Sequence, residues 1–193
     1  IPVFTMDRES NGGEVVSHIG YDAIKSGKLA GQFLVDELGG KGKIVELQGI
    51  IGTNVAQNRS KGFNEVMDAN PDMEIVACQV ADFDRAKAMS VMENILQANP
   101  EIDGLYAAND EMLLGALEAI EAAGRTDKIV KCGCDALDET MDDIRNGSVE
   151  GTIAEPPFFL GKAIVEAAYK YLQGETPEKT VILDNQLVTK DNV

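Results

Sequence analysis

The sequence lacks any apolar run that approaches the roughly 20 residues a helix needs to cross a bilayer. It also lacks the basic, apolar and small-residue pattern of a secretory signal. We therefore expect no direct membrane insertion. The missing signal says little about the compartment, because Ile1 is not an initiator residue and residues 1–6 already have the composition of a core strand. The chain is expected to begin in the middle of a fold.

Basic residues are scarce in this sequence. Lys and Arg total 17 against 33 Asp and Glu, which gives a formal net charge of −16. Such a charge repels nucleic-acid backbones and anionic membrane surfaces. We therefore expect no nucleic-acid partner for this chain.

Residues that carry nucleophilic or metal chemistry are also few. The one histidine, His18, lies in a predicted strand without a GxSxG turn elsewhere, so we expect a structural role for it. Cys78, Cys132 and Cys134 lie in apolar strand-like runs, and we expect them to be buried thiols without chemistry. Cys132 and Cys134 would share one face of a strand, but they lack a second ligand pair for zinc. We expect no catalytic residue and no metal.

Phosphate-binding loops are absent in the form that nucleotide cofactors need. Neither GxxxxGK[ST] nor a GxGxxG after a strand occurs. The glycine-rich residues 39–43 precede a predicted strand instead of following one, so their amides would lie at the wrong end of the sheet. We expect no cofactor.

The sequence is instead a regular alternation of short apolar runs with longer segments of helical period. This alternation is typical of βα units around a parallel sheet, so the predicted fold class is α/β. With 44% hydrophobic residues, a chain of 193 residues can bury a substantial core. The predicted strands are 1–6, 15–20, 43–48, 73–80, 103–107, 129–134, 150–154 and 179–188. The clearest predicted helices are 22–38, 84–98, 110–123 and 157–173.

Polar side chains follow most of the predicted strands, at the end where open α/β sheets bind their ligands. They comprise carboxylates, two arginines, an amide and an aromatic ring: Asp7, Arg8, Arg59, Phe83, Asn109, Asp135 and Glu155. Carboxylates accept hydrogen bonds from hydroxyl groups, and guanidinium groups donate them in pairs. An aromatic face can cover the apolar side of a sugar ring. The set predicts a site for a polyhydroxylated ligand.

Each of these residues, taken alone, also has a simpler interpretation. Acidic and amide side chains at such positions are favourable helix N-caps. The candidate caps are Asn54, Asp84, Asn109 or Asp110, and Asp135 or Asp138. Capping explains the residues singly, whereas a ligand site explains why so many polar groups share one edge.

Six ordered segments make the sequence resemble a known family. They are Thr5-Met6-Asp7-Arg8, Gly13-Glu14-Val15-Val16-Ser17-His18-Ile19, Glu46-Leu47-Gln48-Gly49, Ala81-Asp82-Phe83-Asp84-Arg85, Asn109-Asp110-Glu111-Met112 and Gly151-Thr152-Ile153-Ala154. In these segments and their spacing, from Ile1 to about Lys190, the chain resembles ribose-binding proteins, which have the type I periplasmic binding fold.

The resemblance implies two lobes with doubly wound parallel sheets, joined by crossovers near Tyr21-Asp22, Glu155-Pro156 and Asp184-Asn185. It implies a complete C-terminal lobe, residues 22–155 and 185–193, and part of an N-terminal lobe, residues 1–21 and 156–184. A missing N-terminal segment or a complementary chain would supply the remainder. We expect the 193-residue chain alone to have little sugar affinity and a poorly supported N-terminal lobe.

The function that the resemblance implies is that of a solute-binding protein of an ABC importer. Such a protein encloses ribose, or a related pentose or polyol, between its lobes by hinge closure and delivers it to a membrane permease. The implied location is periplasmic or extracellular, with a lipid anchor compatible with either. By position, the resemblance implies sugar contacts from Asp7, Arg8, Arg59, Phe83, Asn109 and Asp135.

Glu155 departs from the family, which usually has a glutamine at this position. Glutamine donates and accepts hydrogen bonds, whereas an ionised glutamate only accepts them. Three interpretations stay open: Glu155 requires a ligand with an additional donor, it pairs with Arg8 or Arg59, or it is tolerated at a hinge. The answer bears on which sugar is bound more than on whether a sugar is bound.

Two other functions are compatible with the predicted fold. The sugar-effector domain of a lactose-repressor-type transcription factor shares the fold and would follow a basic helix-turn-helix upstream of Ile1. An enzyme acting on a sugar would use Asp7, Asp135 and Glu155 for acid–base chemistry. Neighbouring arginines hold carboxylates ionised, which suits binding better than proton transfer, so we expect no enzyme activity.

Overall fold

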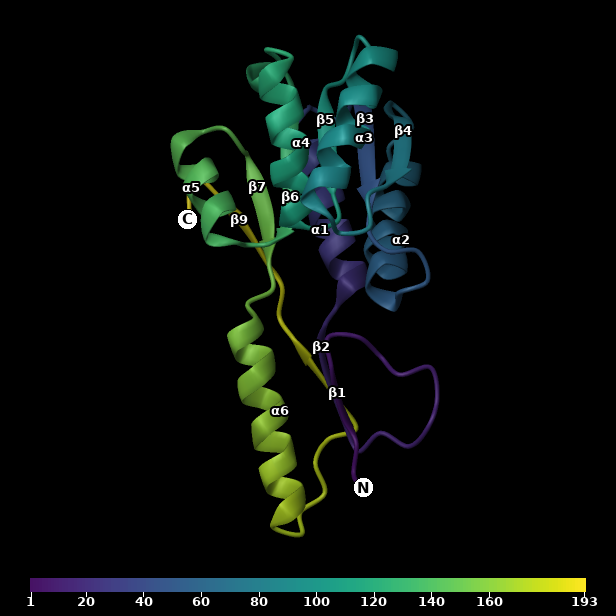
Figure 1. The fold of residues 1–193 in the computed structure, drawn as a ribbon, viewed down its shortest axis with the longest axis vertical. Coiled ribbons are helices and arrows are strands. Elements are labelled where there is room, and N and C mark those ends of the chain that lie inside the picture. Colours follow the sequence, from purple (N-terminus) through teal and green to yellow (C-terminus); the bar gives the residue numbers. More distant parts are fainter.

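The computed structural model describes all of residues 1–193, which form two bodies around separate sheets. The large body contains a six-stranded sheet of order β4-β3-β5-β6-β7-β9, and the small body contains a three-stranded sheet of order β1-β2-β8. Figure 1 shows the two bodies one above the other along the long axis of the molecule. The predicted α/β class is confirmed.

The large body places helices on both faces of its sheet. Its strands are β3 (Gly42–Gln48), β4 (Met73–Val80), β5 (Gly104–Ala107), β6 (Val130–Asp135), β7 (Gly151–Ala154) and β9 (Gln186–Thr189). Its helices are α1 (Ala23–Glu37), α2 (Asn54–Ala69), α3 (Arg85–Ala98), α4 (Asp110–Ala122) and α5 (Asp138–Asn146), with a short 3₁₀ turn at Thr126–Lys128. All pairs are parallel except β7 with β9. Because α1 packs with α2 and α3 with α4 against the sheet, β5 is buried on both faces and is apolar throughout.

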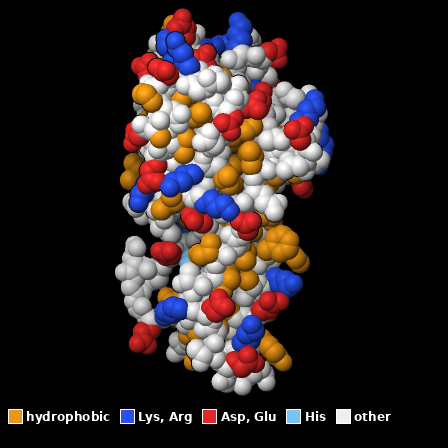
Figure 2. Space-filling view, turned by 180° about the vertical axis from the view of Figure 1, so that it is seen from behind, with side chains coloured by type: hydrophobic (Ala, Val, Ile, Leu, Met, Phe, Trp, Pro, Cys, Tyr) orange, Lys and Arg blue, Asp and Glu red, His pale blue; other side chains and the backbone are white.

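The small body has a much thinner core. It consists of the parallel strands β1 (Phe4–Met6), β2 (Ser17–Tyr21) and β8 (Thr180–Leu183) with helix α6 (Pro157–Leu172). Helix α6 packs on β1 and β2, and Ile19, Leu160 and Ala167 are the buried apolar residues there. Figure 2 shows hydrophobic side chains gathered on the surface of this part of the molecule.

One predicted strand proves to be two strands. The run 179–188 divides at Asp184-Asn185 into β8 of the small sheet and β9 of the large sheet. Both halves contain apolar residues because both enter sheets, and the polar pair Asp184-Asn185 lies where the pairing partners change. The prediction of buried thiols also needs one correction: Cys132 and Cys134 are buried, but Cys78 is exposed because β4 lies at the edge of its sheet.

The N-cap predictions are confirmed for two helices and wrong for two. Asp84 and Asn109 accept backbone N–H bonds of 2.7 Å and 3.0 Å at the starts of α3 and α4. Helix α2 is capped by the Thr53 hydroxyl and not by Asn54. Helix α5 begins after Leu137 without a cap from Asp135 or Asp138.

The connections between the bodies bring the carboxyl ends of both sheets together. Strand β2 runs directly into α1, β7 runs directly into α6, and β8 is followed by β9 (Figure 1). The chain thus crosses at Tyr21-Asp22, at Glu155-Pro156 and at Asp184-Asn185. Since ligands of open α/β sheets bind beyond the carboxyl ends of strands, the space between the bodies is the region to inspect. No helix of the structure has the length and apolar character to span a membrane.

Candidate functional site

Five non-glycine residues have positive backbone φ angles, and each of them lies at the end of a strand or within three residues after it, at the facing edges of the two sheets. Asp7 follows β1 with φ 63°, and Asp82 and Phe83 follow β4 with φ 54° and 58°. Asp135 is the last residue of β6 with φ 124°, and Ala136 follows it with φ 58°. Such conformations cost about 1–3 kcal/mol each and cluster at functional sites. Asp7, Phe83 and Asp135, three of the predicted site residues, are therefore held in strained positions at the facing edges of the two sheets.

Arg59 is the centre of the polar cluster. It projects from α2, is 4% exposed, and donates from Nη1 to the carbonyl oxygen of Ala108 at 2.6 Å. From Nη2 it donates to Asp135 Oδ1 at 3.2 Å and to Glu155 Oε2 at 2.6 Å. Its Nε is buried without a hydrogen-bond partner. The guanidinium group is thus fixed at the carboxyl ends of β5, β6 and β7, with its Nε–H unpaired.

Glu155 pairs with Arg59 and not with Arg8, which decides among the interpretations of this position. Its second oxygen, Oε1, accepts from the Ser26 hydroxyl and, at 2.9 Å, from Asn185 Nδ2. Both carboxylate oxygens are therefore occupied by donors of the protein.

Asp135 is the carboxylate of the cluster that keeps contact with solvent. The pKa of Asp135 is raised to about 6: burial is the largest cause, the neighbouring Arg59 opposes the rise, and the charges of Glu155 and Asp7 add to it. The electrostatic effect of Asp7 shows that the small body contributes a carboxylate to the same region. A carboxylate beside a fixed guanidinium group offers both hydrogen-bond donors and acceptors to a hydroxylated ligand.

Asp110 supports the loop that carries Asp135. Its carboxylate is fully buried and accepts from Leu137 N at 3.0 Å and from the Thr152 hydroxyl at 2.8 Å. A Cβ atom at Gly133 would lie 2.1 Å from Asp110 Oδ1, so only glycine fits there. Burial raises the pKa of Asp110 to about 7. The sequence suggested Asp110 only as a cap, whereas it ties α4 to the ends of β6 and β7.

Phe83, Asn109 and Arg8 take separate positions around the cluster. A Cβ atom at Gly49 would lie 2.0 Å from Cζ of Phe83, so the ring rests directly on the backbone after β3. Asn109 is 8% exposed, caps α4 and follows Ala108, whose carbonyl binds Arg59. Arg8 is exposed, and its Nε lies 3.8 Å from Asp7 Oδ2.

The sequence did not single out Ser26 or Asn185 as site residues. Both are buried, and they hold Glu155 from helix α1 and from the crossover between β8 and β9. Asn185 lies at a crossover that the family resemblance located, but nothing in the local sequence marks Ser26. Only the three-dimensional arrangement brings these side chains together.

A metal ion does not suit the carboxylates of this cluster. Cys134, Asp135 and Glu155 lie close enough to share an ion, with all three ligand atoms within 4.8 Å of one another. The Arg59 guanidinium already supplies the positive charge there. Burial raises the pKa of the Cys134 thiol and so opposes the thiolate that a metal requires.

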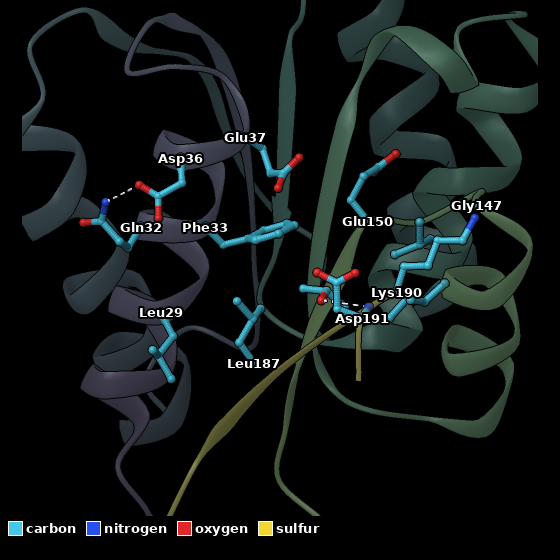
Figure 3. A pocket seen from close by; sticks show the side chains of 13 residues that line it. Leu29, Gln32, Phe33, Asp36, Glu37, Gly147, Glu150, Leu187, Lys190 and Asp191 are labelled. Carbon is cyan, nitrogen blue, oxygen red and sulfur yellow. Dashed lines mark hydrogen bonds between the residues drawn. The ribbon is translucent and has the colours of Figure 1, made fainter. Parts of the chain in front are cut away.

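A separate hollow of about 620 Å³ lies away from the facing strand ends. Figure 3 shows its lining from α1, with Leu29 and Phe33 on one side and Leu187 of β9 across from them. Asp36, Glu37 and Glu150 add acidic groups at its border. It shares no residue with the Arg59 cluster.

Comparison with known proteins agrees with this geometry. The model of the periplasmic binding protein domain matches residues 1–176. The ribose import binding protein RbsB of Escherichia coli (strain K12) is 42% identical over 98% of this chain and 64% of its own length. The D-apiose import binding protein of Actinobacillus succinogenes is 39% identical over 100% of this chain and 63% of its own length. A periplasmic solute-binding protein of an ABC transporter from Actinobacillus succinogenes, solved with bound D-allose, superposes with a TM-score of 0.95 at 29% identity, over 99% of this chain and 69% of that one.

The chain therefore belongs to the periplasmic binding protein family. The sequence-based resemblance to ribose-binding proteins is confirmed, as is the periplasmic binding type of the α/β fold. The chain spans slightly less than two thirds of the curated relatives described above, 63–64% of their length.

Proposed function

We propose that the chain belongs to a periplasmic solute-binding protein that binds a small sugar or polyol between two lobes and delivers it to the permease of an ABC importer. The proposed lobes are residues 1–21 with 156–184 and residues 22–155 with 185–193. The observation that carries the proposal is Arg59, fixed beside Asp135 where the strand ends of the two bodies meet. The proposed sugar-binding residues are Asp7, Arg8, Arg59, Phe83, Asn109 and Asp135, with Glu155 behind Arg59.

The relatives support a sugar ligand without selecting one sugar. Their names specify ribose, D-apiose and xylitol, and the solved structures include one with bound D-allose. All of these ligands carry several hydroxyl groups, which match the mixture of fixed donors and acceptors around Arg59. A sugar that leaves one buried polar group unpaired would lose about 1–3 kcal/mol of binding free energy, so the site can separate epimers.

The proposed mechanism is binding followed by closure, with no chemical change in the ligand. The crossovers allow the bodies to rotate, so a sugar held on the large body would be covered by Asp7 and Arg8 of the small body. Closure would form a surface from both lobes that the permease recognises.

A thermal-shift panel tests this function. The complete product of the gene is heated with D-ribose, D-apiose, xylitol or D-allose at millimolar concentration, and at least one is expected to raise Tm. The Arg59→Met variant is expected to show no increase in Tm with the sugar. The control variant Glu118→Gln, which changes an exposed residue of α4, is expected to keep the increase. If none of the panel raises Tm, the proposed function is wrong.

A further inference from the structure

All three crossovers between the bodies meet at the carboxylate of Glu155. Glu155 begins the second crossover, Ser26 lies in the first turns of α1 just after the first crossover, and Asn185 lies in the third. Glu155 Oε1 accepts from the Ser26 hydroxyl and from Asn185 Nδ2 at 2.9 Å. Asn185 Nδ2 also donates to Ser26 Oγ at 2.6 Å, which closes the triangle.

We propose that Ser26, Glu155 and Asn185 form a hinge clasp that holds the three crossovers together and positions Arg59 for the ligand. In this role Glu155 is a positioning residue and not a sugar contact. The part of the inference that concerns the ligand rests on the function proposed above, whereas the clasp itself can be tested without any sugar.

Burial makes the clasp effective. Ser26 is 0% exposed, Asn185 4% and Glu155 9%, so water competes little for these hydrogen bonds. Hydrogen bonds to a charged group are worth more than neutral ones, and a low local dielectric strengthens them. The exposed crossover contact between Lys25 and Asp184 lacks this protection. The contacts at Glu155 are therefore the buried polar connection between the crossovers, beside the half-buried bond that the Tyr21 hydroxyl donates to the Pro156 carbonyl oxygen at 2.9 Å.

A carboxylate suits the clasp better than an amide. Glu155 receives donors on both sides: the Ser26 and Asn185 groups on Oε1 and the Arg59 guanidinium on Oε2. A glutamine would direct its NH₂ group at one of these donor sets, so the groups on that side would have to turn to present an acceptor, and Glu155 needs no such rearrangement. The structure thus explains why an acceptor-only side chain stands at residue 155.

The clasp reaches the ligand site through a single guanidinium group. Arg59 Nη2 bonds both Glu155 at 2.6 Å and Asp135 at 3.2 Å, and the side chain of Asp135 remains 31% exposed toward the space between the bodies. A displacement of Glu155 at the crossovers would therefore move the guanidinium that faces the ligand. The geometry links opening of the hinge to the donors of the binding site.

Hydrogen–deuterium exchange of the complete gene product without sugar tests the clasp. The Glu155→Gln variant is expected to speed amide exchange at least tenfold in all three crossover segments, residues 20–26, 153–158 and 183–187. The Ser26→Ala variant, which removes one donor, is expected to speed exchange in the same segments by a smaller factor. It provides the test if Glu155→Gln does not fold. The matched control Glu118→Gln is expected to leave them unchanged. Faster exchange confined to the mutated segment would overturn the clasp.

Titration of Asp135 by NMR tests the link to the site. Because Glu155 raises the pKa of Asp135, the Glu155→Gln variant is expected to lower that pKa below about 6. The Ser26→Ala variant keeps the Glu155 charge, so it is expected to leave the pKa of Asp135 unchanged. An unchanged Asp135 pKa in Glu155→Gln would overturn the link. Both experiments are ligand-free, so absence of sugar binding leaves them valid. Sugar binding by Glu155→Gln at the affinity of the unmodified protein, with unchanged exchange, would overturn the clasp and support the proposed function.

Discussion

The two bodies of the molecule differ sharply in how they are held together. The large body has a continuous core of 32 buried apolar residues between helices on both faces of its sheet. The small body has three such residues, and it leaves Phe158, Tyr169 and Leu172 of α6 between 63% and 77% exposed. Ordering a residue costs about 1–2 kcal/mol of backbone entropy, which a core of this size cannot offset. The large body is therefore the stable unit, and the small body depends on its connections to it.

The largest expected effect is the loss of a large side chain from the core of the large body. Phe63 is fully buried and stacks on Tyr106 with ring centroids 4.4 Å apart. We expect Phe63→Ala to lower the free energy of unfolding by about 3–5 kcal/mol in urea titration. Leu160→Ala, in the small body, should lower the free energy of the same transition by much less. Equal losses would break the comparison between the bodies.

Removal of Arg59 is expected to be comparably severe, because it leaves Glu155 buried without its cation. Breaking a buried ion pair by removing one partner costs about 3–5 kcal/mol. We expect Arg59→Met to lower the free energy of unfolding by about this amount in urea titration and to abolish sugar binding in calorimetry. Arg145→Met, which removes an exposed arginine, is the control and should change neither. A fully stable Arg59→Met variant would show that the cluster contributes only to binding.

The stability of the large body should carry a pH dependence from Asp110. Its pKa is about 7 in the folded protein, raised by burial from 3.8. The folded state therefore binds the proton more tightly, so this stabilising contribution is complete below about pH 4 and is lost as pH rises to 7. Asp110→Asn should lose this dependence, and its stability relative to the unmodified protein should rise by at most about 1.4 kcal/mol per pH unit in that window. Urea titrations at several pH values give the two curves, and parallel curves would contradict the assignment.

A methyl group at Gly49 should affect the ligand site more than the core. The added Cβ would lie 2.0 Å from Cζ of Phe83, so the ring must move. Overpacking of this kind costs about 1–3 kcal/mol. We expect Gly49→Ala to weaken sugar binding at least tenfold in calorimetry, whereas Gly161→Ala, where a Cβ meets nothing within 4 Å, should leave it unchanged. Unchanged affinity in Gly49→Ala would remove Phe83 from the proposed site.

The smallest effect is expected for the exposed contact between the crossovers. Lys25 pairs with Asp184, and the two side chains are 44% and 74% exposed. Exposed pairs contribute about 0–1 kcal/mol, so Lys25→Ala should change the free energy of unfolding by less than about 0.5 kcal/mol. Urea titration beside Ser26→Ala provides the comparison. A larger effect for Lys25→Ala would place the connection between the bodies at the surface and not at the hinge clasp.

Much of the fold could be predicted from the sequence because local patterns report burial. The helices predicted at 84–98 and 110–123 agree with α3 and α4 within one residue at each end, since apolar spacing and the caps Asp84 and Asn109 mark them. The cap of α5 could not be predicted in this way. Its first free amide is bound by Asp110, which is 27 residues away in sequence.

The candidate site was predictable as a set of residue types at one edge but not as a network. Arg59, Asp135 and Glu155 follow or face strand ends, and parallel strands bring such ends together. Their pairing, and the roles of Ser26 and Asn185, depend on how the helices and strand ends of the large body pack against each other. No periodicity along the chain encodes that placement.

The sequence by itself determined the α/β class, most strand and helix positions, the family and the polar residues at the strand ends, because periodicity, capping and ordered motifs are local properties of the chain. The tertiary structure alone decided that Cys78 is exposed at an edge and that Glu155 joins three crossovers to Arg59. These features are contacts between residues up to 159 positions apart. They follow from the packing of whole elements, which brings distant side chains within hydrogen-bonding distance.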